Sequence, residues 1–281
     1  EESLVNIQKY NDYHPGDSKA YQMIGDIMFK LKEWDESMFQ YHRILLTRPG
    51  DSKTKYKIAQ CLINKVKYQE AISLLNEILD MEPYFEEIYF ELGQTYYLLG
   101  EFEKSKENFT EYLLLRPNDE NAYYLLGLSY VNLNKYNFAM DAFNKVISIN
   151  ESHANSHYNL AGIYESILDY EKAKYHYRQA KRNKCNHNDL DLKYGTLLYN
   201  MNLFKDAINP FKDYLILNGN NINVLKMLGE IYFKELRFGE SIDVYSKLLE
   251  IEPESTFYKK RLGSSYYQLK SYENAIIYFI F

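Results

Sequence analysis

The sequence contains few of the residues that stabilise small folds covalently. Its two cysteines, Cys61 and Cys185, are too few to staple a chain of 281 residues and match no zinc or redox spacing. The longest uninterrupted apolar run covers residues 275–281, far short of the roughly 18 residues needed to cross a bilayer. We therefore predict no transmembrane segment, and the redox compartment stays open.

Positive charge is also scarce. The chain has 33 Lys and Arg against 39 Asp and Glu, which gives a net charge of -6 and a pI near 5.6. Proteins that bind nucleic acid usually concentrate positive charge, so we do not expect nucleic acid as a partner. Neither a glycine-rich phosphate loop nor a nucleophile elbow is present. We predict no catalytic residue, no cofactor and no enzymatic activity.

What the composition does contain is typical of a folded globular protein, with 46% hydrophobic and 26% charged residues. Tyrosine occurs 30 times and tryptophan once, in a mix that fits an AT-rich coding sequence. The chain begins at Glu1 rather than at a methionine, so we expect a fragment of a longer protein. Its localisation stays open between the cytoplasm and a bacterial cell envelope.

Glycine is sparse, yet its positions are regular. Two gaps in the glycine series are filled by Ala59 and Ala161. The glycines of the series are separated by 34 residues or by twice 34: Gly25, Gly93, Gly127, Gly195, Gly229 and Gly263. Self-similarity at one fixed period predicts a solenoid built from repeated units.

The remaining markers keep the same period. Twelve residues after each small position a second small residue recurs, and a bulky residue follows four later, as in Ser105 and Phe109. The i, i+4 step places such a pair on one face of a helix. Proline, which ends a helix, closes four of the repeats at Pro49, Pro83, Pro117 and Pro253.

This pattern resembles the tetratricopeptide repeat. Nearly the whole signature of that family is present in one repeat, at Tyr89, Leu92, Gly93, Tyr96, Ser105, Phe109 and Pro117. The resemblance covers the entire chain without an insertion or deletion. It implies an all-α fold, a right-handed superhelical solenoid of antiparallel helix pairs in which the first helix of each pair lines the concave side.

The period also predicts the bounds of the repeats. We expect eight of them, the last truncated, at 18–51, 52–85, 86–119, 120–153, 154–187, 188–221, 222–255 and 256–281. Residues 1–17 are in phase with the second helix of a truncated preceding repeat. The repeat at 188–221 is irregular because Pro210 falls inside its second helix, so we expect either a change of superhelix curvature near 185–220 or a plain kink.

The last predicted helix is strongly apolar, from Ala275 to Phe281. Solenoids of this kind need a polar capping helix for solubility, and exposed apolar surface binds a partner. We expect this end to pack against another copy of the chain, in a homo-oligomer, or against further repeats.

The resemblance implies that the concave lining comes from the second, fifth, sixth, ninth, twelfth and thirteenth positions of each repeat. Those positions carry aromatic residues flanked by amides, a combination that suits peptide binding. The predicted peptide-binding residues are Tyr56, Phe90, Gln94, Tyr97, Tyr124, Leu128, Asn132, Asn155, Tyr158 and Asn159. Aromatic residues at the fifth and twelfth positions also serve consensus packing, which is their more common role, so both interpretations stay open.

One known binding mode of the family does not fit. The clamp that holds the C-terminal carboxylate of heat-shock chaperones needs Lys and Asn at set positions of successive repeats, whereas Lys226 is followed by Glu230 and Lys260 by Ser264. Basic residues do gather near the end of the chain, at Lys226, Lys234, Lys259, Lys260 and Arg261. They favour an acidic segment or, more commonly, form a solvated helix face.

A candidate metal site is formed by His153, His157, Cys185 and His187, which equivalent positions of neighbouring repeats bring together. His153 falls in a turn and no carboxylate is directed at the group, so we predict no metal.

From the repeat pattern and the concave lining, we predict a non-catalytic protein–protein interaction scaffold that binds a peptide or an elongated partner. The alternatives are the regulatory or substrate-docking part of a larger enzyme and a structural component of a cell-envelope or multi-subunit assembly.

Overall fold

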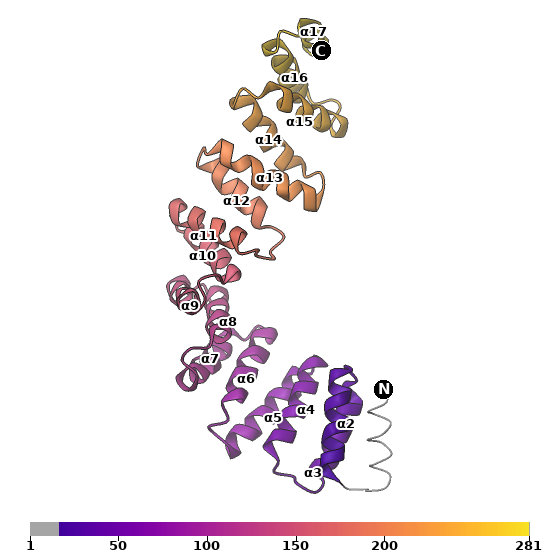
Figure 1. Cartoon of the computed structure of the whole chain (residues 1–281), viewed down its shortest axis with the longest axis vertical. Coiled ribbons are helices and arrows are strands. Elements are labelled where there is room, and N and C mark those ends of the chain that lie inside the picture. Colours follow the sequence, from indigo (N-terminus) through magenta and orange to yellow (C-terminus); the bar gives the residue numbers. More distant parts are fainter. Residues whose placement is uncertain (1–16, 281) are drawn as a thin grey trace. The chain divides into compact units, whose positions relative to one another are not determined.

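The computed structural model describes residues 17–280, and within that range every regular element is a helix (Figure 1). The all-α class is therefore confirmed. The helix predicted in residues 1–17 lies outside the described residues, except for Asp17, whose side chain accepts a hydrogen bond from the first turn of the next helix. In the described part of the chain, no helix combines the length and the apolarity that crossing a bilayer requires.

The chain divides into two compact units, Glu1–Ile149 and Asn150–Phe281. The helices of unit 1 are α2 (Ser18–Lys30), α3 (Trp34–Leu45), α4 (Ser52–Asn64), α5 (Tyr68–Met81), α6 (Glu86–Leu99), α7 (Phe102–Leu115), α8 (Glu120–Asn132) and α9 (Tyr136–Ile149). Those of unit 2 are α10 (Ala154–Ser166), α11 (Tyr170–Arg182), α12 (Leu190–Asn200), α13 (Phe204–Asn218), α14 (Ile222–Lys234), α15 (Phe238–Ile251), α16 (Thr256–Gln268) and α17 (Tyr272–Phe279).

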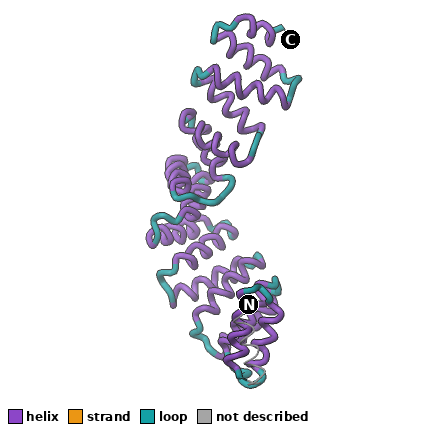
Figure 2. Tube along the Cα trace, turned by 45° about the vertical axis from the view of Figure 1, so that its right-hand side comes forward, coloured by secondary structure: helices purple, strands orange, loops and turns teal. Residues whose placement is uncertain are grey.

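Within each unit, successive helices pack as hairpins joined by short loops (Figure 2). We call the first helix of each hairpin helix A and the second helix B. Each helix B also contacts the helix A that follows it inside the unit, as α3 contacts α4 and α15 contacts α16. This pattern of contacts between neighbours in sequence is that of a helical solenoid.

The phased glycines lie where helix A meets helix B. A methyl group built on Gly127 would come within 2.6 Å of the Phe143 ring, and one on Gly195 within 2.7 Å of the Phe211 ring. Such distances are shorter than a normal non-bonded carbon–carbon contact, so at these two positions glycine lets the buried ring lie directly on the backbone of helix A. This close approach explains why a small residue and a bulky one recur sixteen residues apart.

The second small position is buried for a further reason that the spacing alone does not reveal. The Ser105 hydroxyl donates a hydrogen bond to the Gly93 carbonyl oxygen at 2.9 Å, and Ser37 does the same to Gly25 at 2.9 Å. Ser105 also lies 2.9 Å from the hydroxyl of Ser129 in the next helix A. These serines therefore link the two helices of one repeat and connect that repeat to the next.

The turn from helix A to helix B has the same backbone in every repeat. One residue there has a positive φ, and these residues are again 34 apart: Lys32, Val66, Gly100, Asn134, Leu168, Asn202, Leu236 and Lys270. The left-handed conformation favours glycine, yet seven of the eight positions carry a side chain. Packing of the hairpin therefore fixes the turn against local preference.

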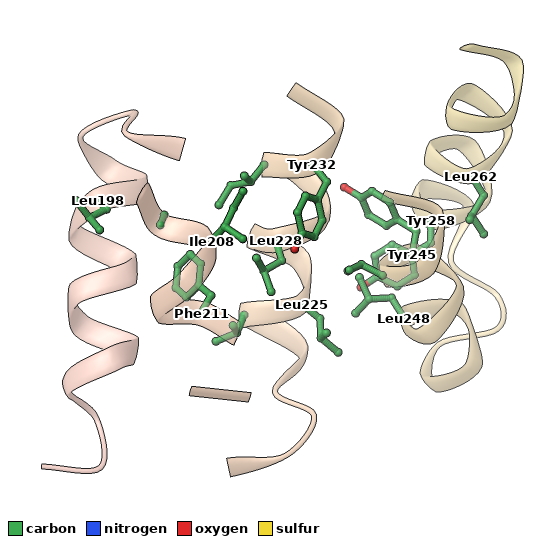
Figure 3. Close-up of a cluster of buried hydrophobic side chains, with 14 residues drawn as sticks. Leu198, Ile208, Phe211, Leu225, Leu228, Tyr232, Tyr245, Leu248, Tyr258 and Leu262 are labelled. Atoms are coloured by element: carbon green, nitrogen blue, oxygen red, sulfur yellow. The ribbon is translucent and has the colours of Figure 1, made fainter. Parts of the chain in front are cut away.

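The interior of unit 2 contains a continuous cluster of buried side chains that passes from α12 to α16 (Figure 3). Phe211 from α13, Leu228 from α14 and Tyr245 from α15 lie in its middle and are at most 2% exposed. A single hairpin could not bury these side chains on both sides. Stacking of consecutive hairpins therefore forms the core.

Pro210 lies inside α13, as the sequence predicts, and its side chain is buried. Proline lacks the backbone N–H that an interior helix position donates, so α13 continues past it with one hydrogen bond fewer. The preceding helix, α12, begins only at Leu190. The division between the two compact units falls after Ile149, so residues 185–220 lie within unit 2 and their predicted change of curvature stays a prediction.

Candidate functional site

The predicted peptide-binding residues are divided between the two compact units. Three of them, Asn155, Tyr158 and Asn159, lie on α10 of unit 2. The other seven lie on α4, α6 and α8 of unit 1: Tyr56, Phe90, Gln94, Tyr97, Tyr124, Leu128 and Asn132. We call those seven, together with Leu98, the unit 1 A face.

On the unit 1 A face, the aromatic rings at the fifth position turn partly inward. Phe90 contacts two rings of its helix B, with centroid distances of 5.7 Å to Phe109 and 5.1 Å to Tyr112. Tyr124 lies 5.9 Å from Phe143 in the same way. These half-buried rings pack helix A onto helix B and leave one side of each ring on the surface.

Tyr56 connects two neighbouring repeats. Its hydroxyl donates a hydrogen bond to Glu91 Oε1 at 2.9 Å, and the Gln60 side-chain amide donates to the same oxygen at 2.9 Å. Burial, and then the negative charge of Glu91, raise the pKa of Tyr56 well above its usual value. Tyr56 therefore stays protonated at physiological pH and holds Glu91 as an acceptor.

The outward part of this face is formed by the ninth, twelfth and thirteenth positions. Leu98 is 56% exposed, and Gln94 lies one helical turn before it on the same side of α6. Asn132 donates to the Leu128 carbonyl at 2.9 Å and lies 3.5 Å from the Tyr97 hydroxyl. Apolar and amide groups thus alternate along α6 and α8.

Tyr158 of unit 2 is placed differently, because it is only 9% exposed and all its polar capacity is used. Its hydroxyl lies 2.8 and 2.9 Å from the two carboxylate oxygens of Asp189 and accepts from Lys193 Nζ at 2.7 Å. The His187 ring stacks on Tyr158 with a centroid distance of 4.0 Å. This network ties α10 to the next repeat and leaves Tyr158 little surface for a ligand.

The electrostatics of the network follow from these contacts. Although partial burial opposes the effect, the hydrogen bonds from Tyr158 and Lys193 lower the pKa of Asp189. Burial would lower the pKa of Lys193, but the hydrogen bonds to Tyr158 and Asp189 outweigh burial and raise it. Asp189 and Lys193 are therefore both charged near neutral pH and form an ion pair with an Oδ2–Nζ distance of 3.1 Å.

The four residues considered as a metal site have separate structural roles. His153 Nδ1 accepts the Ser156 backbone N–H at 3.1 Å and so caps α10, and the Cys185 thiol donates to Asn155 Oδ1 at 3.3 Å. His187 stacks on Tyr158. No group of three His, Cys, Asp or Glu side chains within the described residues has an arrangement that holds a metal ion.

His157 has a partner that the sequence analysis missed. Its Nδ1 lies 2.9 Å from Nδ1 of His176 on α11, and its Nε2 lies 3.1 Å from the Glu151 carbonyl oxygen. The His176 ring stacks on Tyr164 at 5.3 Å. His176 occupies a helix B position outside the predicted lining, so only the packing of α10 on α11 reveals the pair.

Comparisons with known families place the chain among repeat proteins. Residues 103–180 match the family model described as anaphase-promoting complex, cyclosome, subunit 3, and residues 66–129 match the model described as tetratricopeptide repeat. No curated protein sequence matches the chain.

Several solved structures are similar to this one. A tetratricopeptide repeat protein from Parabacteroides merdae is 15% identical, with a TM-score of 0.60 over 88% of this chain and 98% of that one. MamA from Desulfovibrio magneticus is 18% identical, with a TM-score of 0.57 over 59% of this chain and 94% of that one. YrrB, described as a TPR protein with an unusual peptide-binding site, is 19% identical, with a TM-score of 0.55 over 64% and 93%. At these identities the likeness shows the fold alone.

Proposed function

Because this chain is a tetratricopeptide-repeat protein, we propose that it is a non-catalytic scaffold that binds a peptide or an elongated partner protein on the unit 1 A face. Folds of this family typically mediate protein–protein interaction. Shared architecture does not specify a ligand, so the proposal is argued from the surface itself.

One observation carries the proposal: outward apolar groups lie beside an amide whose hydrogen-bonding capacity is unused. Leu98 is exposed, Leu128 is half-buried, and the Gln94 side chain makes no hydrogen bond to any residue among 17–280. An extended peptide needs apolar contacts for affinity and amide partners for its backbone groups. This face offers both.

The rigidity of the face supports the same proposal. The aromatic rings of this face, such as Phe90 and Tyr124, are held against helix B, and Tyr56 donates a hydrogen bond to Glu91 of the next repeat. A surface that is already ordered loses little conformational entropy when it binds. The structure of YrrB, whose description names a peptide-binding site, offers an analogy for this use of the fold.

The test is selection of short peptides from a random displayed library by the intact chain, followed by measurement of affinity with Leu98→Glu and Gln94→Ala. We expect Leu98→Glu to weaken the selected peptides by about tenfold or more, since it places a charge in the apolar contact. The matched control is Leu114→Glu on helix B of the same repeat, where the side chain is 71% exposed.

Helicity by circular dichroism should be unchanged in all three variants because none of these side chains is buried. Selected peptides that bind wild type and Leu98→Glu equally, or that lose affinity only with Leu114→Glu, would show that the unit 1 A face is not the binding surface.

A further inference from the structure

The helix A surface of unit 2 carries an excess of positive charge although the whole chain is acidic. Lys226, Glu230 and Lys234 follow one another at every fourth residue of α14, so they share one helix face. Lys260 occupies the position of α16 that corresponds to Lys226, and Arg261 follows it directly. We call Lys226, Lys234, Lys260 and Arg261 the α14–α16 cationic surface.

Aromatic rings hold two of these cations in place without neutralising them. Lys234 Nζ lies 4.6 Å from the centre of the Phe204 ring, and Arg261 Cζ lies 4.6 Å from the centre of the Phe233 ring. Within residues 17–280, no carboxylate reaches ion-pair distance of Lys234, Lys260 or Arg261. A cation over a ring keeps its full charge and its hydrogen-bond donors.

Among the described residues of α14 and α16, Glu230 is the one carboxylate, and it is already engaged. The Tyr199 hydroxyl donates a hydrogen bond to Glu230 Oε2 at 2.5 Å. Lys226 Nζ lies 5.7 Å from the centre of the Tyr258 ring, and its one ion pair is long, with 3.8 Å between Nζ and Glu252 Oε1 and both side chains more than 40% exposed. Such an exposed pair holds its partner weakly, so Lys226 can exchange Glu252 for another carboxylate.

Apolar groups lie on the same helix as the cations. Phe257 is 45% exposed beside Arg261, with a distance of 5.2 Å from the Arg261 Cζ to the ring centre. Tyr267 is 57% exposed at the other end of α16. A ligand on this surface therefore meets positive charge and large exposed rings together.

From these contacts we propose that the α14–α16 cationic surface binds an acidic, extended segment of a partner protein, with Asp or Glu side chains that pair with Lys234 and Arg261. The arginine guanidinium can receive a carboxylate with two parallel hydrogen bonds. The inference rests on the proposed function in one respect only, namely that the chain binds protein. It concerns a separate surface and a defined chemistry.

Nucleic acid fits these residues less well. The surface has four cations interrupted by Glu230, on a chain with a net charge of -6. Proteins that bind a phosphate backbone present a longer and more continuous positive field. A terminal carboxylate held by lysine and asparagine is also a poor fit, because Glu230 and Ser264 occupy the positions where such a clamp would need asparagine.

The test uses a fluorescent peptide with alternating acidic and aromatic residues and an amidated C-terminus, measured by anisotropy with the intact chain. The comparison probes are the same peptide with Gln and Asn in place of Glu and Asp, and a short oligo-dT strand. We expect the acidic peptide to bind at least about tenfold more tightly than either probe and to weaken as salt rises.

The double variant Lys234→Glu/Arg261→Glu should weaken the acidic peptide by about tenfold or more. Its matched control is Lys247→Glu/Arg178→Glu, which makes the same change in net charge at exposed helix B positions of unit 2. Because Arg261 also packs on rings, Lys234→Glu/Lys260→Glu repeats the test with two exposed side chains and is used if the first variant loses helicity.

Equal losses in the test and control variants would overturn the inference, because they would show a response to net charge alone. Tighter binding of the neutral peptide or of oligo-dT would overturn it as well. Either result would leave the peptides that depend on Leu98 unaffected, so failure of this inference is distinguishable from failure of the proposed function.

Discussion

Unit 1 and unit 2 have the same interior and different outer faces. In both, a glycine of helix A lies against an aromatic ring of helix B, as Gly127 does on Phe143 and Gly195 on Phe211. On the surface, α6 and α8 of unit 1 present Leu98 and amides, whereas α14 and α16 of unit 2 present Lys234 and other cations. The difference teaches that the period of the sequence preserves packing, while the outward positions of helix A are free to vary in charge and polarity.

The shared interior predicts equal damage from equal substitutions. Gly127→Val in unit 1 and Gly195→Val in unit 2 should each lower the free energy of unfolding by roughly 3 kcal/mol, since the new side chain overlaps a buried ring. Denaturant unfolding followed by circular dichroism measures the loss, and hydrogen exchange locates it.

The control for this pair is Gly162→Val in α10, where an added Cβ meets nothing within 4 Å and little change is expected. A large cost in one unit and none in the other would break the claim that the two interiors are equivalent.

The two units should differ in how their stability depends on pH. Burial, and then the charges of His157 and Lys172, lower the pKa of His176 from 6.5 to about 4, whereas the one described histidine of unit 1, His42, is exposed. Between these pH values the unfolded chain binds a proton at His176 that the folded chain does not. The stability contributed by neutral His176 is therefore complete above about pH 6.5 and declines as pH falls towards 4.

Acid lowers the free energy of unfolding of unit 2 between about pH 6.5 and pH 4. We expect His176→Gln to make this decrease smaller, by on the order of 2 kcal/mol, as measured by unfolding across that pH window. The comparison is between pH slopes, since the variant also loses its contacts with His157 and Tyr164 at neutral pH. His42→Gln is the control, and a slope identical in wild type and His176→Gln would contradict the assignment.

The smallest expected effect is the difference in stability lost when the hydroxyl is removed from two tyrosines, one in each unit. Tyr158→Phe should cost about 1 to 2 kcal/mol because it leaves Asp189 and Lys193 without their shared partner. Tyr97→Phe in unit 1 should cost less than about 0.5 kcal/mol, since within residues 17–280 the Tyr97 hydroxyl has only a 3.5 Å contact with Asn132.

Thermal unfolding of the two variants measures this difference. Equal losses of stability in the two variants would mean that the hydrogen bonds around Tyr158 do not stabilise the packing between its two repeats.

Much of the fold was predictable because packing imposes a period that the sequence must keep. The glycine at 127 and the ring at 143 are visible as a spacing, and the helices follow from it. The left-handed turn at Val66 was not predictable, because a β-branched residue favours the opposite conformation and tertiary contacts override it.

The surfaces were less accessible to sequence reasoning. Tyr158 looks like a ligand anchor by position, and only the stacking of repeats shows that Asp189 and Lys193 occupy its hydroxyl. The period does place those two residues at the second and sixth positions of the next repeat, so a search for charges beside the fifth position could have found them. The pairing of His157 with His176 depends on the contact between helix A and helix B and leaves no such trace.

The left-handed residue between helix A and helix B has a consequence for how the array can change. At Val66 and Leu168 the side chains are mostly exposed, so what each turn requires is a backbone shape rather than a chemical group. Almost any residue can therefore occupy that corner at a modest local energy cost, whereas adding or removing one residue would rotate helix B away from its glycine. This turn tolerates substitutions but not insertions. An array of repeats can therefore diverge in sequence while the length of each repeat stays constant.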